Sequence, residues 1–148
     1  MKKRVVIPSI LLLLVIAFIF YRSSKPTAEE QITSIVESHE SELKELSIQQ
    51  LNGDFSSTSF DNIKVDGVYT NEDGESIVQF FYSGLGIAPA GKYYGFYYSP
   101  NDIPVAFQNT DYKLEKDNGI WKWSEGNSDN GGFTKRISEC WYYYEAWF

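Results

Sequence analysis

The N-terminal apolar run constrains this chain more than any other feature of its sequence. Residues 5–20 contain no charged side chain, and only Pro8 and Ser9 interrupt the apolar series. A helix over this run would be roughly 25 Å long, a little less than the ~30 Å hydrocarbon core of a bilayer, and flanking basic side chains can cover the difference. The run therefore predicts a transmembrane signal anchor over residues 1–22, with Val5–Tyr21 in the lipid bilayer.

The charges that flank this run predict its orientation. Three basic residues and the amino terminus precede it, whereas Arg22 and Lys25 follow it. The excess on the N-terminal side favours a cytoplasmic N-terminus. We therefore expect a single pass through the plasma membrane, a polar linker over residues 23–27 and an extracytoplasmic domain over residues 28–148.

Cleavage of the run as a signal peptide is the alternative, and it would release a secreted domain. Cleavage needs small residues one and three positions before the cut. Residues 15–17 fit that rule but lie inside the apolar run. A cut after Ser23 or Ser24 would place Tyr21 or Arg22 at the third position before it, and neither residue is small. No cysteine lies directly after the run, so a lipid-bearing cysteine at its end is excluded.

Composition limits what the domain can bind. Removal of the basic tip at residues 2–4 leaves ten Lys and Arg side chains against twenty Asp and Glu. Such a surface repels phosphate backbones, so we expect no nucleic-acid partner. Cys140 is the only cysteine, which excludes an intramolecular disulfide and a cysteine-based metal cluster. We expect no metal and no cofactor.

A long helix is predicted at the start of the domain, from Ala28 to about Asn52. Thr27 and Glu30 form a capping-box pattern, and Gly53 is a plausible stop. The apolar stripe between them can pack on a sheet or pair with a second copy as a stalk, and we expect packing on the sheet. The stripe comprises Ile32, Ile35, Val36, Leu43, Leu46 and Leu51.

Beyond Gly53 the pattern changes to that of strands. Residues 118–119 are Asn-Gly, which suits a type I′ hairpin turn. The register then pairs Glu115 with Lys122 and Leu114 with Trp123. Further strands are predicted from Ile63 and over residues 77–82, 93–98 and 137–147, with a turn at 71–74.

One helix followed by about six antiparallel strands predicts the α+β class. The expected form is a helix-wrapped sheet of the general cystatin-like or nuclear-transport-factor-like kind. A small β-sandwich or barrel after a helical stalk is the alternative. Either likeness concerns architecture alone and transfers no function.

The C-terminal half carries the densest aromatic clusters, at residues 93–98 and 141–148, with a Gly-rich segment at 130–134 between them. Over roughly residues 75–148 this pattern resembles small uncharacterised exported proteins of Gram-positive bacteria. The resemblance implies a bacterial plasma membrane and supplies no activity or functional residue.

Aromatic side chains make up 17% of the chain and suggest a binding surface. If one strand face were exposed, its rings could stack on sugars or anchor a protein interface; otherwise they fill the core. The loops at 83–92, 99–104 and 125–133 would frame a site if two of them met at one end of the sheet. The predicted ligand-binding residues are Tyr94, Tyr97, Trp121, Trp123, Trp141 and Tyr143.

Few side chains suggest catalysis. His39 falls on the apolar stripe, and Cys140 in the last strand could be a nucleophile activated by it, although structural roles are the simpler interpretation. The pairs Glu139 with Glu145 and Glu125 with Asp129 could be a glycosidase acid and base.

The segment 125–131 resembles a calcium loop only superficially. Its glycine comes one residue late, and Arg136 stands where the closing glutamate belongs. We expect a flexible hairpin loop.

We therefore predict a non-enzymatic binding or accessory module outside the membrane, which recognises a protein partner or a cell-wall glycan. The alternative is a small cell-envelope hydrolase, which requires two buried acids with raised pKa values in one cleft. A third possibility is self-association through the helix, and the oligomeric state is left open.

Overall fold

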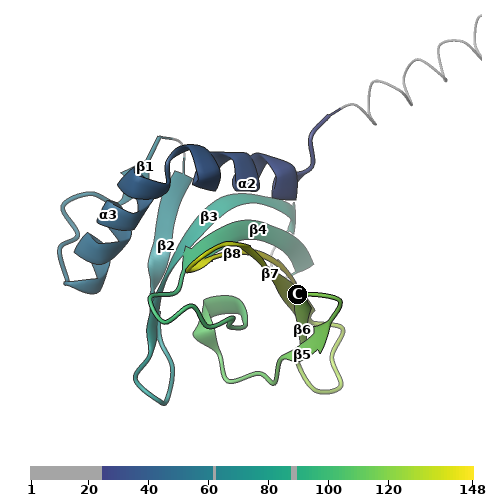
Figure 1. Ribbon diagram of the computed structural model, residues 1–148. Coiled ribbons are helices and arrows are strands. Elements are labelled where there is room, and N and C mark those ends of the chain that lie inside the picture. The colour runs from purple at the N-terminus through teal and green to yellow at the C-terminus, as the bar shows by residue number, and fades with distance from the viewer. Residues whose placement is uncertain (1–24, 62, 88–89) are drawn as a thin grey trace, which may run out of the picture.

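The computed structural model describes residues 25–61, 63–87 and 90–148. Within them the chain forms two helices and one antiparallel sheet of eight strands, which confirms the α+β class (Figure 1). The predicted span Val5–Tyr21 lies outside this part of the chain. No helix in the described part has the length and hydropathy needed to cross a membrane.

The sheet places the C-terminal strand near its centre. The strands follow the order β1-β2-β3-β4-β8-β7-β6-β5, so β8 pairs with β4 on one side and with β7 on the other. The expectation of about six strands was wrong, and β1 and β7 are the two additions. The strands are β1 (Ser59–Phe60), β2 (Ile63–Thr70), β3 (Ser76–Ile87), β4 (Ala90–Tyr98), β5 (Glu115–Asp117), β6 (Ile120–Ser124), β7 (Gly131–Ser138) and β8 (Trp141–Trp147).

The predicted single helix is two helices, α2 (Ala28–Ser38) and α3 (Glu40–Leu51), which meet at His39. The start of α2 is as predicted, because the Thr27 N–H donates to the Glu30 carboxylate (2.7 Å) and the Glu30 N–H donates to the Thr27 hydroxyl (3.2 Å). The backbone of His39 leaves the helical region at φ −132°, so a single helix to Asn52 was wrong.

The helices lie against the sheet. Ile32, Val36 and Leu43 are completely buried and join the core cluster that includes Phe80 and Trp141. Packing on the sheet is therefore confirmed, and the helical-stalk alternative is wrong. The apolar stripe that self-association would need is used within the fold.

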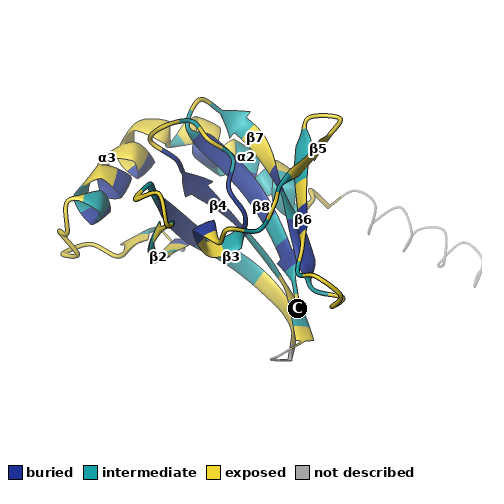
Figure 2. Cartoon of the chain, turned by 90° about the horizontal axis from the view of Figure 1, so that it is seen from below, coloured by how far each residue is buried: buried dark blue, intermediate teal, exposed yellow. Residues whose placement is uncertain are grey.

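The sheet is arched, and both of its faces are covered (Figure 1). The two helices lie over the convex side. The segment 99–114, with its 3₁₀ turn η1 (Phe107–Asn109), lies beneath the arch. The sheet thus curves around this segment, whereas the predicted helix-wrapped sheet would have the helix on its concave side. Seen from below, the second half of β4 and most of β8 are buried (Figure 2).

A second core cluster forms beneath the arch. It contains Ile77, Tyr97, Tyr142 and Tyr144 from the strands and Val105 from the segment 99–114, among other residues. The Tyr97 ring stacks on the Tyr142 ring with centroids 5.2 Å apart, and the Val105 N–H donates to the Tyr97 hydroxyl (2.9 Å). These contacts hold the segment 99–114 against the concave face.

The predicted hairpin at residues 118–119 is confirmed. Asn118 and Gly119 have positive φ angles of 50° and 81°, and Glu115 lies opposite Lys122. The predicted strand over residues 137–147 was wrong, because Ser138 pairs with Trp141 across a turn. Cys140 lies in that turn at φ 66° and not within the strand.

Candidate functional site

The predicted exposed aromatic face is not present in the described structure. Trp141, Tyr97, Tyr143 and Trp123 are each at most 5% exposed, and only Tyr94 and Trp121 among the six predicted residues are partly exposed. The physical reason is that α2 and α3 cover one face of the sheet and the segment 99–114 covers the other. Four of the six residues therefore supply mainly core packing, and only small parts of Tyr143 and Trp123 reach surface pockets.

A different set of aromatic residues lines a pocket beneath the arch, which we call the arch pocket. Its volume is ≈ 610 Å³. It is built from strands β2, β3, β4 and β8, from η1 and from the loop that precedes β7. Its lining residues are Asp66, Phe81, Tyr93, Phe107, Gln108, Asn130, Tyr144 and Phe148.

Four rings of the arch pocket contact one another. The Phe107 ring lies 5.4 Å from the rings of Tyr144 and Phe148 and 6.3 Å from that of Tyr93, measured between centroids. The Tyr93 and Phe148 rings meet edge to face at 5.9 Å. Phe148 is 38% exposed, so this cluster opens to solvent on its side. The arrangement gives the pocket a rigid apolar wall.

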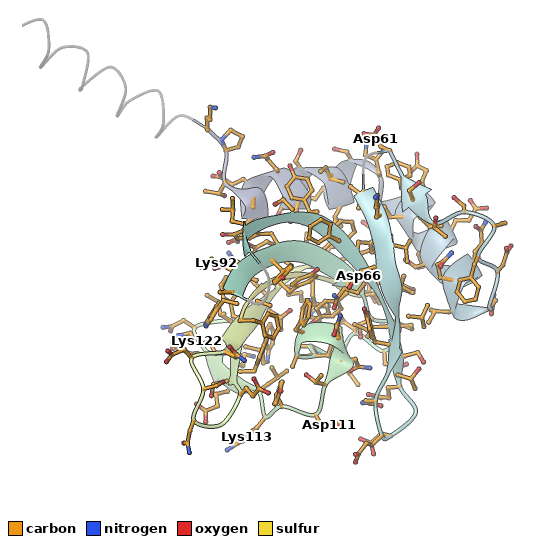
Figure 3. The ribbon with its side chains drawn as sticks, turned by 180° about the vertical axis from the view of Figure 1, so that it is seen from behind. Asp61, Asp66, Lys92, Asp111, Lys113 and Lys122 are labelled. Atoms are coloured by element: carbon orange, nitrogen blue, oxygen red, sulfur yellow. The ribbon has the colours of Figure 1, made fainter. Side chains whose placement is uncertain are left out.

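A hydrogen-bonded network forms the polar side of the arch pocket. The Asp66 carboxylate accepts from the Tyr69 hydroxyl (3.0 Å) and from the Gln79 amide (2.8 Å). The Gln108 amide donates to the Tyr69 hydroxyl (3.0 Å), and the Gln108 N–H donates to the Gln79 side-chain oxygen (3.0 Å). Figure 3 shows Asp66 beneath the arch beside β2.

The same network keeps the Tyr69 hydroxyl protonated. Burial first, and then the Asp66 charge, raises the pKa of Tyr69 to about 12. At neutral pH the phenol is therefore a donor that orients the Asp66 carboxylate. Carboxylate and amide groups fixed in this way can pair with hydroxyl or amide groups of a ligand.

Gln108 reaches the pocket from a strained turn. Gln108 and Asn109 have positive φ angles of 54° and 53°, which non-glycine residues adopt at a cost. The buried Asn109 amide compensates by donating to the carbonyls of Tyr69 (3.1 Å) and Glu75 (2.9 Å). Strain of this kind gathers at ligand sites, and here it presents the Gln108 side chain beneath the arch.

The loop at 125–131 supports the rim of the arch pocket. The Glu125 carboxylate accepts from Asn130 (2.6 Å), Tyr112 (3.0 Å) and Ser128 (3.4 Å). The hydrogen bonds from Asn130 and Tyr112 lower the pKa of Glu125. Glu125 thus ties the loop together, and the predicted acid–base pair with Asp129 gains no support from this geometry.

The other predicted acids are also held apart. Glu145 lies in β8 and forms an ion pair with Lys92 (2.7 Å), whereas Glu139 lies in the turn before β8. In the described residues, every carboxyl group whose pKa is shifted has it lowered by hydrogen bonds, as for Glu30 and Glu42. The hydrolase interpretation requires two carboxyl groups with raised pKa values in one cleft, and this part of the chain shows no such pair.

His39 and Cys140, considered above as a base and a nucleophile, have different neighbours in the structure. The His39 ring contacts Phe60 at 5.0 Å, and the Cys140 N–H donates to Asp102 (2.8 Å). Burial and the Asp102 charge raise the pKa of the Cys140 thiol, which disfavours the reactive thiolate. No group of three or more His, Cys, Asp or Glu side chains able to hold a metal occurs in the described residues.

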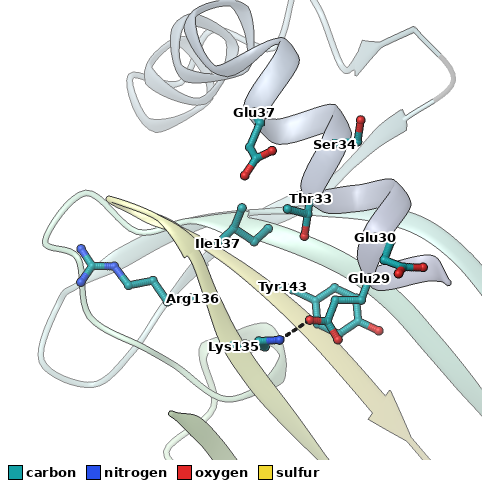
Figure 4. Close-up of a pocket in the computed structure, with 9 residues that line it drawn as sticks. All are labelled: Glu29, Glu30, Thr33, Ser34, Glu37, Lys135, Arg136, Ile137 and Tyr143. Carbon is teal, nitrogen blue, oxygen red and sulfur yellow. Dashed lines mark hydrogen bonds and ion pairs between the residues drawn. The ribbon is translucent and has the colours of Figure 1, made fainter. Parts of the chain in front are cut away.

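A smaller groove of ≈ 370 Å³ lies between α2 and β7 (Figure 4). Glu29 and Lys135 point toward each other across it and form an ion pair. Tyr143 is the only aromatic residue among the described residues that line this groove, so the groove lacks the aromatic wall of the arch pocket.

Comparisons with protein-family models, with curated proteins and with solved structures found no match to this chain. The resemblance to exported proteins of Gram-positive bacteria therefore stays a prediction, and the site must be interpreted from its own chemistry.

Proposed function

We propose that this chain is a membrane-anchored extracytoplasmic binding module that holds a cell-wall glycan in the arch pocket. Val5–Tyr21 would span the plasma membrane with the N-terminus in the cytoplasm, and residues 23–27 would link it to the domain. The observation that carries the proposal is the meeting of an aromatic wall with the Asp66 and Gln108 network in one open pocket.

The chemistry of this pocket suits a pyranose ring. Sugar rings present apolar C–H faces, which pack on aromatic rings, and polar edges, which pair with carboxylate and amide groups. Tyr93, Phe107 and Phe148 supply the first kind of surface, and Asp66 and Gln108 supply the second. The pocket volume of ≈ 610 Å³ also falls in the usual range of small-ligand sites, about 300–1,000 Å³.

A protein partner fits the arch pocket less well. Stable protein interfaces cover about 800 Å² on each partner and are largely flat around a few anchors. The large rings expected to form such a face are mostly core residues here. The concave form of the pocket favours a small ligand or a glycan chain end.

Phe148→Ala tests the proposal. The Phe148 backbone exchanges two hydrogen bonds with Gly91 (3.0 and 3.1 Å), which alanine keeps, so the variant removes only the ring. The full chain in detergent would be titrated with the tetramer of N-acetylglucosamine by calorimetry and sedimented with purified peptidoglycan. We expect about a tenfold loss of affinity in both assays, which corresponds to ~1.4 kcal/mol.

Phe55→Ala is the matched control, because Phe55 is 61% exposed and does not line the arch pocket. It should bind both probes as the unaltered chain does. Equal binding by all three proteins, or no binding by the unaltered chain, would exclude a glycan site in this pocket.

A further inference from the structure

The outer end of the β3–β4 hairpin extends past the strands beside it. β2 pairs with β3 only as far as Phe81. On the other side, the last backbone hydrogen bonds to β4 are those between Phe148 and Gly91. Residues 83–91 carry no charged side chain. Leu85 is 70% exposed, the largest exposure among the large apolar side chains of the described residues. An apolar side chain is thus presented on a projecting hairpin, where the fold gives it little cover.

This hairpin end lies beside the linker that leads to the predicted anchor. Lys25, Pro26 and Thr27 share a surface depression of ≈ 790 Å³ with Ser83, Gly84 and Leu85, among other residues. Figure 3 shows Lys92, the partner of Leu85 across the hairpin, on the side of the sheet from which the linker leaves. The 24 residues before Lys25, which include the predicted span, therefore join the domain at this end.

The side chains around Leu85 are of the kinds found at a membrane interface. The Lys92 amine lies 5.7 Å from the centre of the Trp147 ring and forms an ion pair with Glu145 (2.7 Å). Trp is enriched at the level of the lipid headgroups, and Lys extends its amine toward them while its stem covers apolar surface. Insertion of one leucine needs no cluster of basic residues, and the predicted anchor, which would hold the domain at the bilayer, offsets the repulsion between acidic side chains and anionic headgroups.

We propose that the Leu85 end of the β3–β4 hairpin inserts into the headgroup layer of the bilayer that holds the anchor, with Lys92 and Trp147 at the same level. This proposal rests on the membrane anchor of the proposed function. The contact fixes the orientation of the domain, because the linker and the hairpin hold it at two points. The arch pocket, which shares Tyr93 and Phe148 with this end of the sheet, then opens close to the membrane surface.

A fluorescent label at Leu85 tests this contact. Leu85→Cys would be made in a Cys140→Ser background and labelled with a fluorophore that reports polarity, and the full chain would be reconstituted in phosphatidylcholine vesicles. We expect a blue-shifted emission and at least about a twofold quenching by lipids with a quencher near the headgroup. Phe55→Cys in the same background is the control, because the segment 52–58 lies at the opposite end of the molecule (Figure 1).

The outcomes separate the contact from the anchor. If the chain fails to float with the vesicles, both the anchor and the contact are overturned. If it floats and the label at Leu85 matches the one at Phe55, only the contact is overturned. A label at Leu85 that is shielded in a dimer but not quenched by lipid would assign this end to self-association and would also overturn the proposal.

Discussion

At the scale of single residues, Gly95 allows the centre of the sheet to form. A Cβ atom at this position would lie 2.1 Å from the Phe80 carbonyl oxygen and 2.5 Å from the Tyr144 hydroxyl. Gly95 pairs with Tyr144 across the β4–β8 register, so the Tyr144 ring lies over the glycine. That ring then forms part of the wall of the arch pocket. The absence of one side chain therefore contributes to both the core and the site.

Gly95→Ala should consequently destabilise the fold by about 3 kcal/mol, because atoms of two neighbouring strands must move. Urea unfolding followed by tryptophan fluorescence measures this change. Gly84→Ala is the control, since its added carbon would approach nothing closer than 3.3 Å, and it should cost less than about 1 kcal/mol. Equal losses in the two variants would show that Gly95 has no special role.

At the scale of elements, the sequence predicted the structures whose signals are local. The Asn118-Gly119 turn carries its own conformational preference, and the Thr27–Glu30 capping box closes within one helical turn. The break at His39 has no such signal, because neither glycine nor proline lies near it. The two helices instead follow the sheet, α2 over β4, β7 and β8 and α3 over β3.

The β7–β8 turn also depends on distant residues. Cys140 adopts a positive φ without a glycine, and no Gly, Pro, Asn or Asp occurs in residues 137–147 to mark a turn, so this stretch looks like one strand. Asp102 supplies what the local sequence does not. Its carboxylate accepts from the Cys140 N–H (2.8 Å) and from the Tyr142 hydroxyl (3.0 Å), and it forms an ion pair with Arg136.

Asp102→Gly should therefore cost about 2 kcal/mol, because the Cys140 N–H loses its acceptor and the ion pair with Arg136 is removed, whereas the Tyr142 hydroxyl keeps the Asp102 backbone carbonyl (2.8 Å) as acceptor. Glycine is chosen because Asp102 has a φ of 54°, which glycine adopts without strain. Asp102→Asn keeps an acceptor oxygen and loses only the charge, so it should cost about 1 kcal/mol or less. Urea unfolding of both variants gives the two free energies of unfolding. If Asp102→Asn lowers this free energy as much as Asp102→Gly does, the role assigned to the hydrogen bonds is contradicted.

The arch pocket was less accessible to sequence analysis than the strands were. Side chains alternate along a strand, so Tyr93 and Tyr97 lie on one face of β4 and Tyr94 lies on the other, but alternation does not tell which face is covered. That depends on the segment 99–114, whose path beneath the arch has no periodic signal. Phe107 and Gln108 enter the site through this segment, so neither was predicted.

At the scale of the whole molecule, buried phenols are spread through both core clusters. Tyr97, Tyr142 and Tyr144 lie beneath the arch and Tyr143 lies on the helix side. In each of these four residues burial is the main cause that raises the pKa of the hydroxyl above its ordinary value of 10.0. Tyr69 joins them with a pKa of about 12. The core as a whole is therefore built on neutral phenols.

Stability should consequently fall as the pH rises above about 10, the pKa of a tyrosine in the unfolded chain. Below that pH both states keep their phenolic protons and stability from this source is constant. Above it the unfolded chain releases protons that the native state retains, so the unfolded state binds fewer protons and the free energy of unfolding decreases with pH. For Tyr69 the loss continues until the pH reaches about 12. Urea midpoints measured across this range, with tyrosinate absorbance as a second signal, test the effect.

Tyr69→Phe should show a shallower decline of the urea midpoint than the unaltered chain, because it lacks one of the phenols whose pKa is raised by folding. A midpoint that stays constant above pH 10 in both proteins would contradict the assignment.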